Sequence, residues 1–357
     1  MRIVFFSFTR SGALLSHKLA LSLKTGKVCL YAPEKAAEAA VKELESQSGS
    51  EGILFYRFDP NLLKTVAVEF NKADALIFIG AAGIEIRSIA PYIKDKFKDP
   101  AVLCMDEAGE FVIPLLSGHI GGANELAEKI AEINGSLKVI TTATDVRKLW
   151  AVDVFAKKNQ LAISDRKAAR LISASLLEDK NIGFFSDYQI KGRLPKQLLD
   201  SKEGEYNVFI TNKLEINKTV KNPALRLIPK NICLGVGCRR DTGFHQLLRT
   251  LKILLKNHNI DIKSISHIAS IDIKKDEACI IKLANALNAE LCFFNAAELA
   301  KAEGEFNDSE FVSRITGVGN VCERACRLVY KEPLFKKEVH SGMAFAASID
   351  LAREYEL

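Results

Sequence analysis

The sequence lacks several features that would assign it to a familiar class of protein. No apolar run among its 357 residues reaches the roughly 18 residues that a bilayer-spanning helix needs, which excludes an integral membrane protein. The N-terminus has a single Arg and a short apolar run without a small-residue cleavage site, so it does not read as a signal peptide. We therefore expect a cytoplasmic protein.

Metal and nucleotide motifs are also missing. The eight cysteines form no CxxC pair, and most lie in apolar runs, where cysteine behaves as a small hydrophobic residue. Cys322 and Cys326 would share one helix face, but without further ligands nearby a packing role is favoured. There is no Walker A loop, no HExxH and no GxSxG. The sequence therefore predicts no metal site and no cofactor.

Positive charge is concentrated in one part of the chain, whose formal net charge is +6. Residues 151–230 hold 15 Lys and Arg against 9 Asp and Glu, whereas the rest of the chain balances 35 against 35. That segment has no run of consecutive basic residues and no aromatic–basic alternation, so nucleic-acid binding is not predicted. The excess is compatible with a small polyanionic ligand and also with a solvated basic surface.

What is present predicts an α/β protein of two or three domains, with 48% hydrophobic and 26% charged residues. Residues 1–145 alternate strand-like runs with helical stretches, which favours an N-terminal α/β domain with a doubly wound, mostly parallel sheet. The strand candidates are 2–7, 27–31, 52–56, 74–80, 101–105, 110–116 and 137–144. Because only Asp106–Gly109 separates the fifth from the sixth, those two should form a hairpin.

The remaining chain predicts two further parts. Residues 146–230 contain shorter strands interrupted by Lys-rich polar stretches, which indicates a small middle domain. From 231 to 357 the regular pattern resumes, which indicates a C-terminal α/β domain. Its expected strands are 231–237, 264–270, 291–294 and 343–348, with helices from about 242, from 274 and across 321–330.

Two glycine-rich loops follow predicted strands, and ligands of open α/β sheets bind where loops leave the carboxyl ends of strands. The first loop is Gly80–Gly83, ahead of a helix that contains Arg87. Its small residues would admit a ligand to backbone N–H groups at a helix N-terminus, although a tight turn explains them equally well. The second loop is Ser117–Asn124, which combines three glycines with three polar side chains.

His119 in the second loop could act as a general base or acid, since imidazole titrates near neutral pH, and neighbouring backbone N–H groups could support an oxyanion. The alternative is a histidine that only anchors the loop. Thr141–Asp145 ends the next predicted strand with four polar side chains, which either cap a helix or line the same crevice.

The C-terminal part begins with a Gly235-x-Gly237 sequence, which lacks the third glycine of a dinucleotide loop. Arg239 and Arg240 follow it and suit bidentate recognition of carboxylates. Cys238 has no His close in sequence, so a packed thiol is favoured over a nucleophile. Further polar or glycine residues at strand and helix junctions are Ser270, Asp272, Lys274 and Gly319.

Several stretches resemble the CbiG family of anaerobic cobalamin biosynthesis. In the N-terminal half these are GAAGIEIRSIAPYIKDKFKDPAV, FVIPLLSGHIGGANELAEKIA and VITTATD. LGVGCRRDT, ASIDIKKDEACIIKLANAL and GVGNVCERA are similar to the family's C-terminal domain, in the same order. The resemblance covers most of 1–145 and 231–350, and the middle part matches in position and size only. Asp241 departs from the family's pattern, where Gly or another small residue is expected.

The resemblance implies hydrolysis of cobalt-precorrin-5A to cobalt-precorrin-5B, by opening of a δ-lactone and release of acetaldehyde. The cobalt belongs to the substrate, so no cofactor is implied. His119 is the first candidate for the catalytic base and Asp145 the second. The candidate substrate-binding residues are Gly80, Gly83, Arg87, Ser117, Gly118, Gly121, Gly122, Asn124, Thr141, Thr142, Thr144, Gly235, Gly237, Arg239, Arg240, Ser270, Asp272, Lys274 and Gly319.

Two alternatives stay open. A non-enzymatic cobalt-corrinoid carrier is one, because the C-terminal part also resembles a stand-alone protein of the aerobic pathway. A general α/β acyl hydrolase is the other, and the missing GxSxG disfavours it. The expected partners are the small corrinoid substrate and, transiently, neighbouring enzymes of the pathway. The sequence leaves the oligomeric state open.

Overall fold

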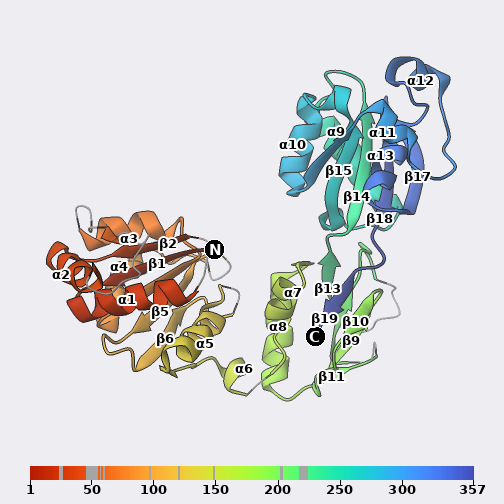
Figure 1. The fold of residues 1–357 in the computed structure, drawn as a ribbon. Coiled ribbons are helices and arrows are strands. Elements are labelled where there is room, and N and C mark those ends of the chain that lie inside the picture. Colours follow the sequence, from red (N-terminus) through yellow and green to blue (C-terminus); the bar gives the residue numbers. More distant parts are fainter. Residues whose placement is uncertain are drawn as a thin grey trace. The chain divides into compact units, whose positions relative to one another are not determined.

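The chain divides into two compact units, Met1–Leu149 and Trp150–Leu357, and each is described by itself (Figure 1). The structure is a computed structural model. It describes residues 1–23, 27–45, 55–56, 58, 61–95, 98–119, 121–147, 149–201, 204–216 and 224–357. None of the helices in these ranges is long and apolar enough to cross a membrane.

A seven-stranded sheet in the order β3-β2-β1-β4-β5-β6-β7 forms the centre of the first unit. The strands are β1 (Arg2–Ser7), β2 (Lys27–Tyr31), β3 (Phe55–Tyr56), β4 (Ala75–Ile79), β5 (Ala101–Met105), β6 (Phe111–Leu116) and β7 (Leu137–Lys138). All neighbours are parallel except β5 and β6, which the turn at Asp106–Gly109 joins as an antiparallel hairpin. The predicted doubly wound, mostly parallel sheet and its hairpin are confirmed.

Helices cover both faces of this sheet, as alternation along its buried strands requires. Ile3 and Phe5 of β1 face one core cluster together with residues of α1 and α5, whereas Val4 and Phe6 face a second cluster with residues of α3 and α4. The helices are α1 (Arg10–Leu23), α2 (Glu34–Glu45), α3 (Leu62–Phe70), α4 (Ala82–Ile89), α5 (Ala123–Asn134) and α6 (Ala143–Val146), with a 3₁₀ turn at Ala90–Tyr92.

Two expectations for this unit need correction. The strand expected over 137–144 ends at Lys138, and α6 begins at Ala143 with Thr142 as its N-cap position. Polar side chains such as those of Thr141–Asp145 favour turns and helix starts over ladder pairing, which accounts for the early end of the strand. The helix after β4 begins at Ala82, so Gly83 lies in its first turn rather than in the loop. Of the strand expected at 52–56, residues 52–54 lie outside the described residues.

The second unit contains two five-stranded sheets, ordered β11-β9-β12-β13-β8 and β16-β15-β14-β18-β17. The first comprises β8 (Leu161–Ile163), β9 (Ile182–Ser186), β11 (Leu198–Leu199), β12 (Tyr206–Ile210) and β13 (Ala224–Pro229), with α7 (Val152–Lys158) and α8 (Arg166–Leu177). The second comprises β14 (Ile232–Cys238), β15 (Ile265–Ile271), β16 (Glu290–Phe294), β17 (Glu332–His340) and β18 (Met343–Ile349). These sheets form the middle and C-terminal α/β parts that the sequence predicts.

The C-terminal sheet is also covered on both faces. Ile232 and Leu234 of β14 pack into a cluster with α9 and α10, whereas Cys233 packs into another with α13. The helices are α9 (Phe244–Asn257), α10 (Ala278–Leu287), α11 (Ala296–Ala300), α12 (Glu310–Thr316) and α13 (Val321–Val329), with 3₁₀ turns at Ile262–Ser264 and Asp272–Lys274. The helix expected from 274 therefore begins four residues later.

The last described strand returns to the middle part. β19 (Glu354–Glu356) pairs in parallel with β10 (Gln189–Lys191), and Tyr355 is buried in the middle part's core, which β8, β9, β12 and β13 line (Figure 1). The sequence assigns these residues to the C-terminal domain, but their packing partners belong to the middle part. An ion pair of 2.7 Å between Arg226 and Asp261 also joins the two parts.

Candidate functional site

The described residues of the loop Ser117–Asn124 are closely packed, and this packing requires glycine at particular positions. A Cβ atom at Gly121 would lie 2.2 Å from the Cβ of Ser117, so only glycine fits there. Gly122 has a φ of 86° and is the N-cap residue of α5. The N–H groups of Gly122, Ala123 and Asn124 donate to the carbonyls of His119, Ser117 and Gly118. These three N–H groups are therefore committed within the turn and do not offer an oxyanion site.

His119 and Asp145, the two candidates for the base, lie together. The Nε2 atom of His119 is 2.8 Å from the Thr144 hydroxyl and 3.5 Å from Asp145 Oδ2. Asn124 donates from its side-chain nitrogen to the same Oδ2 at 2.5 Å and to the Thr142 hydroxyl at 3.3 Å. The Ser117 loop and the start of α6 thus form one hydrogen-bonded cluster.

This cluster leaves one nitrogen of His119 available. Nδ1 forms no hydrogen bond or ion pair with the part of the chain that the structure describes, while Nε2 is engaged by Thr144 and Asp145. If Nε2 carries the proton, this N–H group can donate a hydrogen bond to those two oxygens, and Nδ1 keeps a lone pair. The His119 side chain is 21% exposed, so a ligand can reach it. The arrangement suits a base whose orientation is fixed by its neighbours.

The Gly80 loop and the Ser117 loop lie at opposite edges of the sheet, that is, at opposite ends of its strands. Gly80 donates to the carbonyl of Met105, at the carboxyl ends of β4 and β5. Because β6 is antiparallel to β5, its end returns to the start of β5, where Leu116 faces Val102. The five residues of β5 separate the two edges by about 13–17 Å at the usual rise per residue. The two glycine-rich loops, which both follow predicted strands, therefore lie at opposite edges of the sheet.

At that other edge, the Gly80 loop is closely packed. A Cβ atom at Gly80 would lie 2.6 Å from a ring carbon of Phe8, and the guanidinium of Arg87 lies against Gly83. Arg87 is exposed and forms no ion pair with described residues. Glu85 of the same helix is buried, and its desolvation raises the pKa of its carboxyl group to about 9. Glu85 is not among the residues that the sequence predicts to be functional, and no motif or spacing around Glu85 indicates such a role.

In the C-terminal part, several candidates have packing roles. A Cβ atom at Gly235 would lie 1.8 Å from the carbonyl oxygen of Cys322, so this glycine lets α13 approach β14. Gly319 is buried against Asp308 in the same way. Ser270 is fully buried and donates to the carbonyl of Val236 at 2.8 Å, which removes its side chain from any ligand. Gly237 has no such close contact.

The arginines after β14 are exposed. Arg239 and Arg240 form no ion pair within the described ranges, and Arg240 lines a cavity of about 530 Å³ with Thr242, Phe244 and Lys282 among others. Asp241 between them and the helix has a φ of 58°, a conformation that glycine adopts most easily and Asp tolerates. The departure at Asp241 therefore preserves the backbone turn. Asp272 is exposed, and Lys274 pairs with Glu277 at 2.9 Å.

Three family models match consecutive parts of the chain. "Cobalamin synthesis G N-terminal" matches residues 64–145, "Cobalamin biosynthesis central region" matches 150–229, and "Cobalamin synthesis G C-terminus" matches 232–348. A curated "Cobalt-precorrin-5A hydrolase" of Salmonella typhimurium is 34% identical over 340 residues, covering 92% of this chain and 91% of the relative.

The chain belongs to the CbiG family.

A second curated "Cobalt-precorrin-5A hydrolase", of Priestia megaterium, is 28% identical and covers 90% of this chain and 87% of its own. A crystal structure of a cobalamin biosynthesis protein G homolog from Sulfolobus solfataricus is 20% identical, covering 97% of this chain and 96% of that chain with a TM-score of 0.40.

The segments that match the CbiG family models contain both groups of candidate site residues. The N-terminal match runs from α3 to Asp145 and so contains His119, Asn124 and the Gly80 loop. The C-terminal match contains Arg239, Arg240 and the cavity beside them, but ends before β19. The side-chain cluster around His119 thus lies in a segment that the family shares.

Proposed function

We propose that this chain hydrolyses cobalt-precorrin-5A, opening its δ-lactone and releasing the extruded ring carbon with its methyl group as acetaldehyde. Two curated relatives that each cover about nine-tenths of the chain carry the name of that hydrolase. The observation that carries the assignment of the site is the approach of His119 to Thr144 and Asp145, with no partner for Nδ1 among the described residues.

The reaction needs a base in two steps. First, His119 Nδ1 would remove a proton from water as the oxygen adds to the lactone carbonyl, and collapse of the adduct breaks the ring C–O bond to give a carboxylate and a hydroxyethyl group. Second, removal of the hydroxyl proton lets that C–O bond become a carbonyl. The C–C bond electrons then pass to the macrocycle, which takes up a proton as acetaldehyde leaves.

Asn124 and Thr144 would act by positioning. Asn124 holds the Asp145 carboxylate, and that carboxylate together with the Thr144 hydroxyl holds the Nε2 side of the ring. An imidazolium formed at His119 would then be stabilised by a carboxylate 3.5 Å away. Asp145 is the second candidate for the base, although two of its neighbours already occupy Oδ2.

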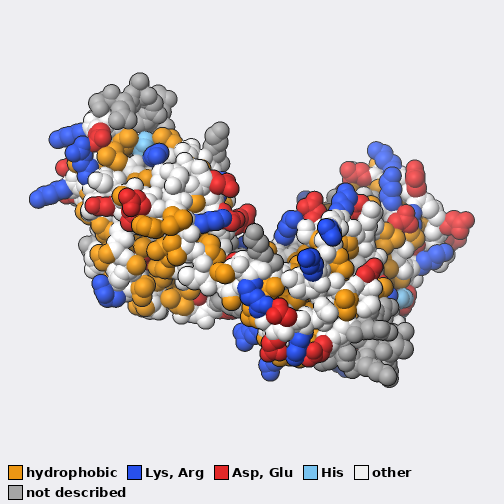
Figure 2. All heavy atoms as spheres, turned by 90° about the horizontal axis from the view of Figure 1, so that it is seen from below, with side chains coloured by type: hydrophobic (Ala, Val, Ile, Leu, Met, Phe, Trp, Pro, Cys, Tyr) orange, Lys and Arg blue, Asp and Glu red, His pale blue; other side chains and the backbone are white. Residues whose placement is uncertain are grey.

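Binding of the substrate's carboxylates would fall to exposed arginines. Arg239 and Arg240 are cations without ion-pair partners among the described residues, and Arg240 lines a cavity. Figure 2 shows Lys, Arg, Asp and Glu side chains interspersed on the face in view, so the excess of positive charge does not gather into one patch there. We also propose that the reaction needs no added cofactor, because the cobalt is part of the substrate, and that it occurs in the cytoplasm.

One assay separates the hydrolase from the alternative carrier. Purified protein treated with a chelator is incubated anaerobically with cobalt-precorrin-5A, and acetaldehyde is measured as its hydrazone. The hydrolase releases one aldehyde per corrinoid converted, whereas a carrier binds the corrinoid and releases none. Binding without aldehyde, or dependence on added nicotinamide, ATP or zinc, would overturn the proposal. The names of the curated relatives favour the hydrolase.

A further inference from the structure

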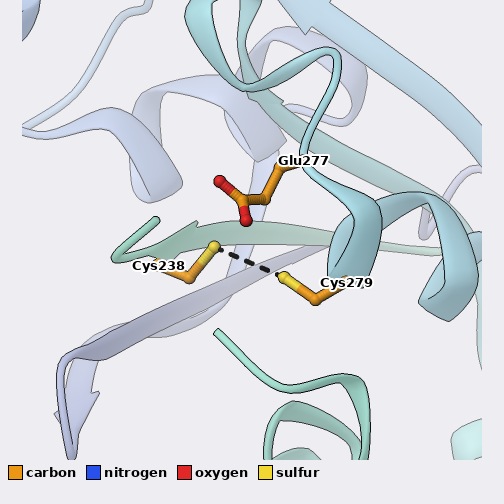
Figure 3. Close-up of side chains that lie close together, drawn as sticks. All are labelled: Cys238, Glu277 and Cys279. Carbon is orange, nitrogen blue, oxygen red and sulfur yellow. Dashed lines mark hydrogen bonds between the residues drawn. The ribbon is translucent and has the colours of Figure 1, made fainter. Parts of the chain in front are cut away.

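Two thiols and a carboxylate meet where β14 ends and α10 begins (Figure 3). The Sγ atoms of Cys238 and Cys279 are 3.7 Å apart. A ligand atom of each cysteine and of Glu277 lies within 4.8 Å of the others. Cys238 is partly exposed and Cys279 is buried, so the group has an outer and an inner side. The two cysteines are 41 residues apart in sequence, which hides this group from any search for a local motif.

We propose that Cys238, Cys279 and Glu277 bind a thiophilic divalent metal ion, of which Zn²⁺ and Co²⁺ are the probes. Two sulfur ligands at about 2.3 Å from a tetrahedral ion are separated by roughly 3.7 Å, which is the distance between these two Sγ atoms. Two thiolates with one carboxylate form a donor set that selects such ions over Mg²⁺ or Ca²⁺. This site does not depend on the hydrolysis proposed above.

The surroundings leave room for a fourth ligand. Glu277 and Cys279 line the cavity of about 530 Å³ that also contains Arg240 and Lys282. A bound ion would therefore have three protein ligands and one position facing the cavity, open to water or another small ligand. It would also tie the end of β14 to the start of α10.

The carboxylate is already oriented. Lys274 donates to Glu277 Oε2 at 2.9 Å, and the backbone N–H of Asp241 donates to Oε1 at 3.2 Å. Partners of this kind fix the direction of a metal ligand.

A second group of potential ligands is less suitable. His267, Glu290 and Cys292 also lie within 4.8 Å of one another. This second group contains a single thiol, and Glu290 is 75% exposed, so this carboxylate would be poorly fixed. The Nδ1 atom of His267 is also engaged by Ser266 and Tyr330. Cys292 therefore provides a matched control for the Cys238 site.

The test is a titration of the reduced full chain with Co²⁺ under argon, in a reductant that is not a thiol. We expect one ion per chain, with the charge-transfer absorption of thiolate-bound cobalt. Loss of an outer ligand partner weakens metal binding about 10- to 100-fold, so Cys238→Ser or Cys279→Ser should weaken it at least about 100-fold, and Glu277→Gln at least about 10-fold. Cys292→Ser should bind as the wild type does.

Alkylation of the wild-type chain gives a second measurement that needs no variant. Co²⁺ or Zn²⁺ should protect Cys238 from iodoacetamide, as located by peptide mass spectrometry, and should leave the modification of Cys292 unchanged. Circular dichroism checks that each variant folds, and if Cys279→Ser does not, Glu277→Gln and the alkylation result decide. The absence of thiolate absorption, equal binding by the Cys238 variant, or a loss confined to Cys292→Ser would overturn the proposal.

Discussion

The hydroxyl group of Ser117 donates a hydrogen bond of 3.0 Å to the backbone carbonyl of Asp99. Asp99 precedes β5 and Ser117 follows β6, so this bond joins the two ends of an antiparallel pair. It fixes the His119 loop beside the start of β5, and the parallel pairing of β6 with β7 brings Thr141–Asp145 to the same edge. The hairpin thus explains why His119 meets Asp145 rather than Arg87.

Replacement of His119 by Ala tests its role as the base. We expect kcat to fall about 10²- to 10⁴-fold, the usual range for loss of a general base, with KM nearly unchanged because binding groups remain. Thermal stability is measured on the same variant. If kcat stays within a few-fold while the melting temperature falls, His119 only anchors the loop, and Asp145→Asn becomes the variant to assay. His340→Ala, on β17, is the control.

Replacement of Arg239 or Arg240 by Ala tests recognition of the substrate's carboxylates. Each change should chiefly raise KM and leave kcat close to that of the wild type, as expected when uniform binding is lost. Arg314→Ala is a matched control, because Arg314 is 81% exposed and its pair with Glu310 is 3.8 Å long. Steady-state kinetics over a range of substrate concentrations gives both parameters. Wild-type KM in both variants would remove the arginines from the binding site.

Gly121→Ala tests the turn that holds His119. The added Cβ would overlap the Cβ and carbonyl oxygen of Ser117, so the loop must shift, at a cost of about 1–3 kcal/mol in the free energy of unfolding. Gly243→Ala is the control, because Gly243 has ordinary backbone angles and no atom within 4 Å of the new group. Denaturant unfolding measures the difference. Equal stability of the two variants would contradict the tight packing described for this turn.

Glu85 should make stability depend on pH. Burial raises the pKa of its carboxyl group from 4.5 to about 9, so between these values the folded chain retains a proton that the unfolded chain has lost. The contribution of this group to the free energy of unfolding is therefore fully present below about pH 4.5. It declines as pH rises towards 9, by at most about 1.4 kcal/mol per pH unit.

Glu85→Gln isolates this effect, since Gln resembles the protonated acid and does not titrate. Relative to the wild type, the variant should gain stability between pH 6 and 8.5, by up to about 3 kcal/mol. Thermal unfolding followed by circular dichroism at both pH values measures the change. Glu132→Gln, at an exposed position on α5, is the control and should show no such gain. If the stability of the wild type and of Glu85→Gln changes equally between the two pH values, Glu85 is ionised in the folded chain.

Local patterns predict much of this fold. The alternation of apolar runs with helical stretches identifies the parallel sheet, and the short Asp106–Gly109 segment identifies the hairpin. The same hairpin reverses β6 and so decides at which edge of the sheet the Ser117 loop lies, and no single motif indicates this. His119 and Asp145 were both candidates, but their contact depends on the early end of β7, because a strand continuing to 144 would carry Thr144 away from the loop.

Other features depend on contacts between distant residues. Gly235 lies within β14 and Gly319 follows α12, and only the packing of α13 and Asp308 against them reveals their structural role. Cys238 has a partner in Cys279 only because the crossover through β15 returns α10 to the end of β14. Spacing along the chain contains no information about that proximity.

The pairing of β19 with β10 affects the order in which the parts of the chain can complete their cores during synthesis. Tyr355 completes a core otherwise built from residues 152–227, so that core lacks this side chain until residue 355 has been synthesised. The C-terminal sheet, whose strands span residues 232–349, can finish first. A nascent chain would therefore present the exposed apolar lining of its middle part for the whole time that the next part takes to be synthesised, and this is the stage at which a chaperone would be most useful.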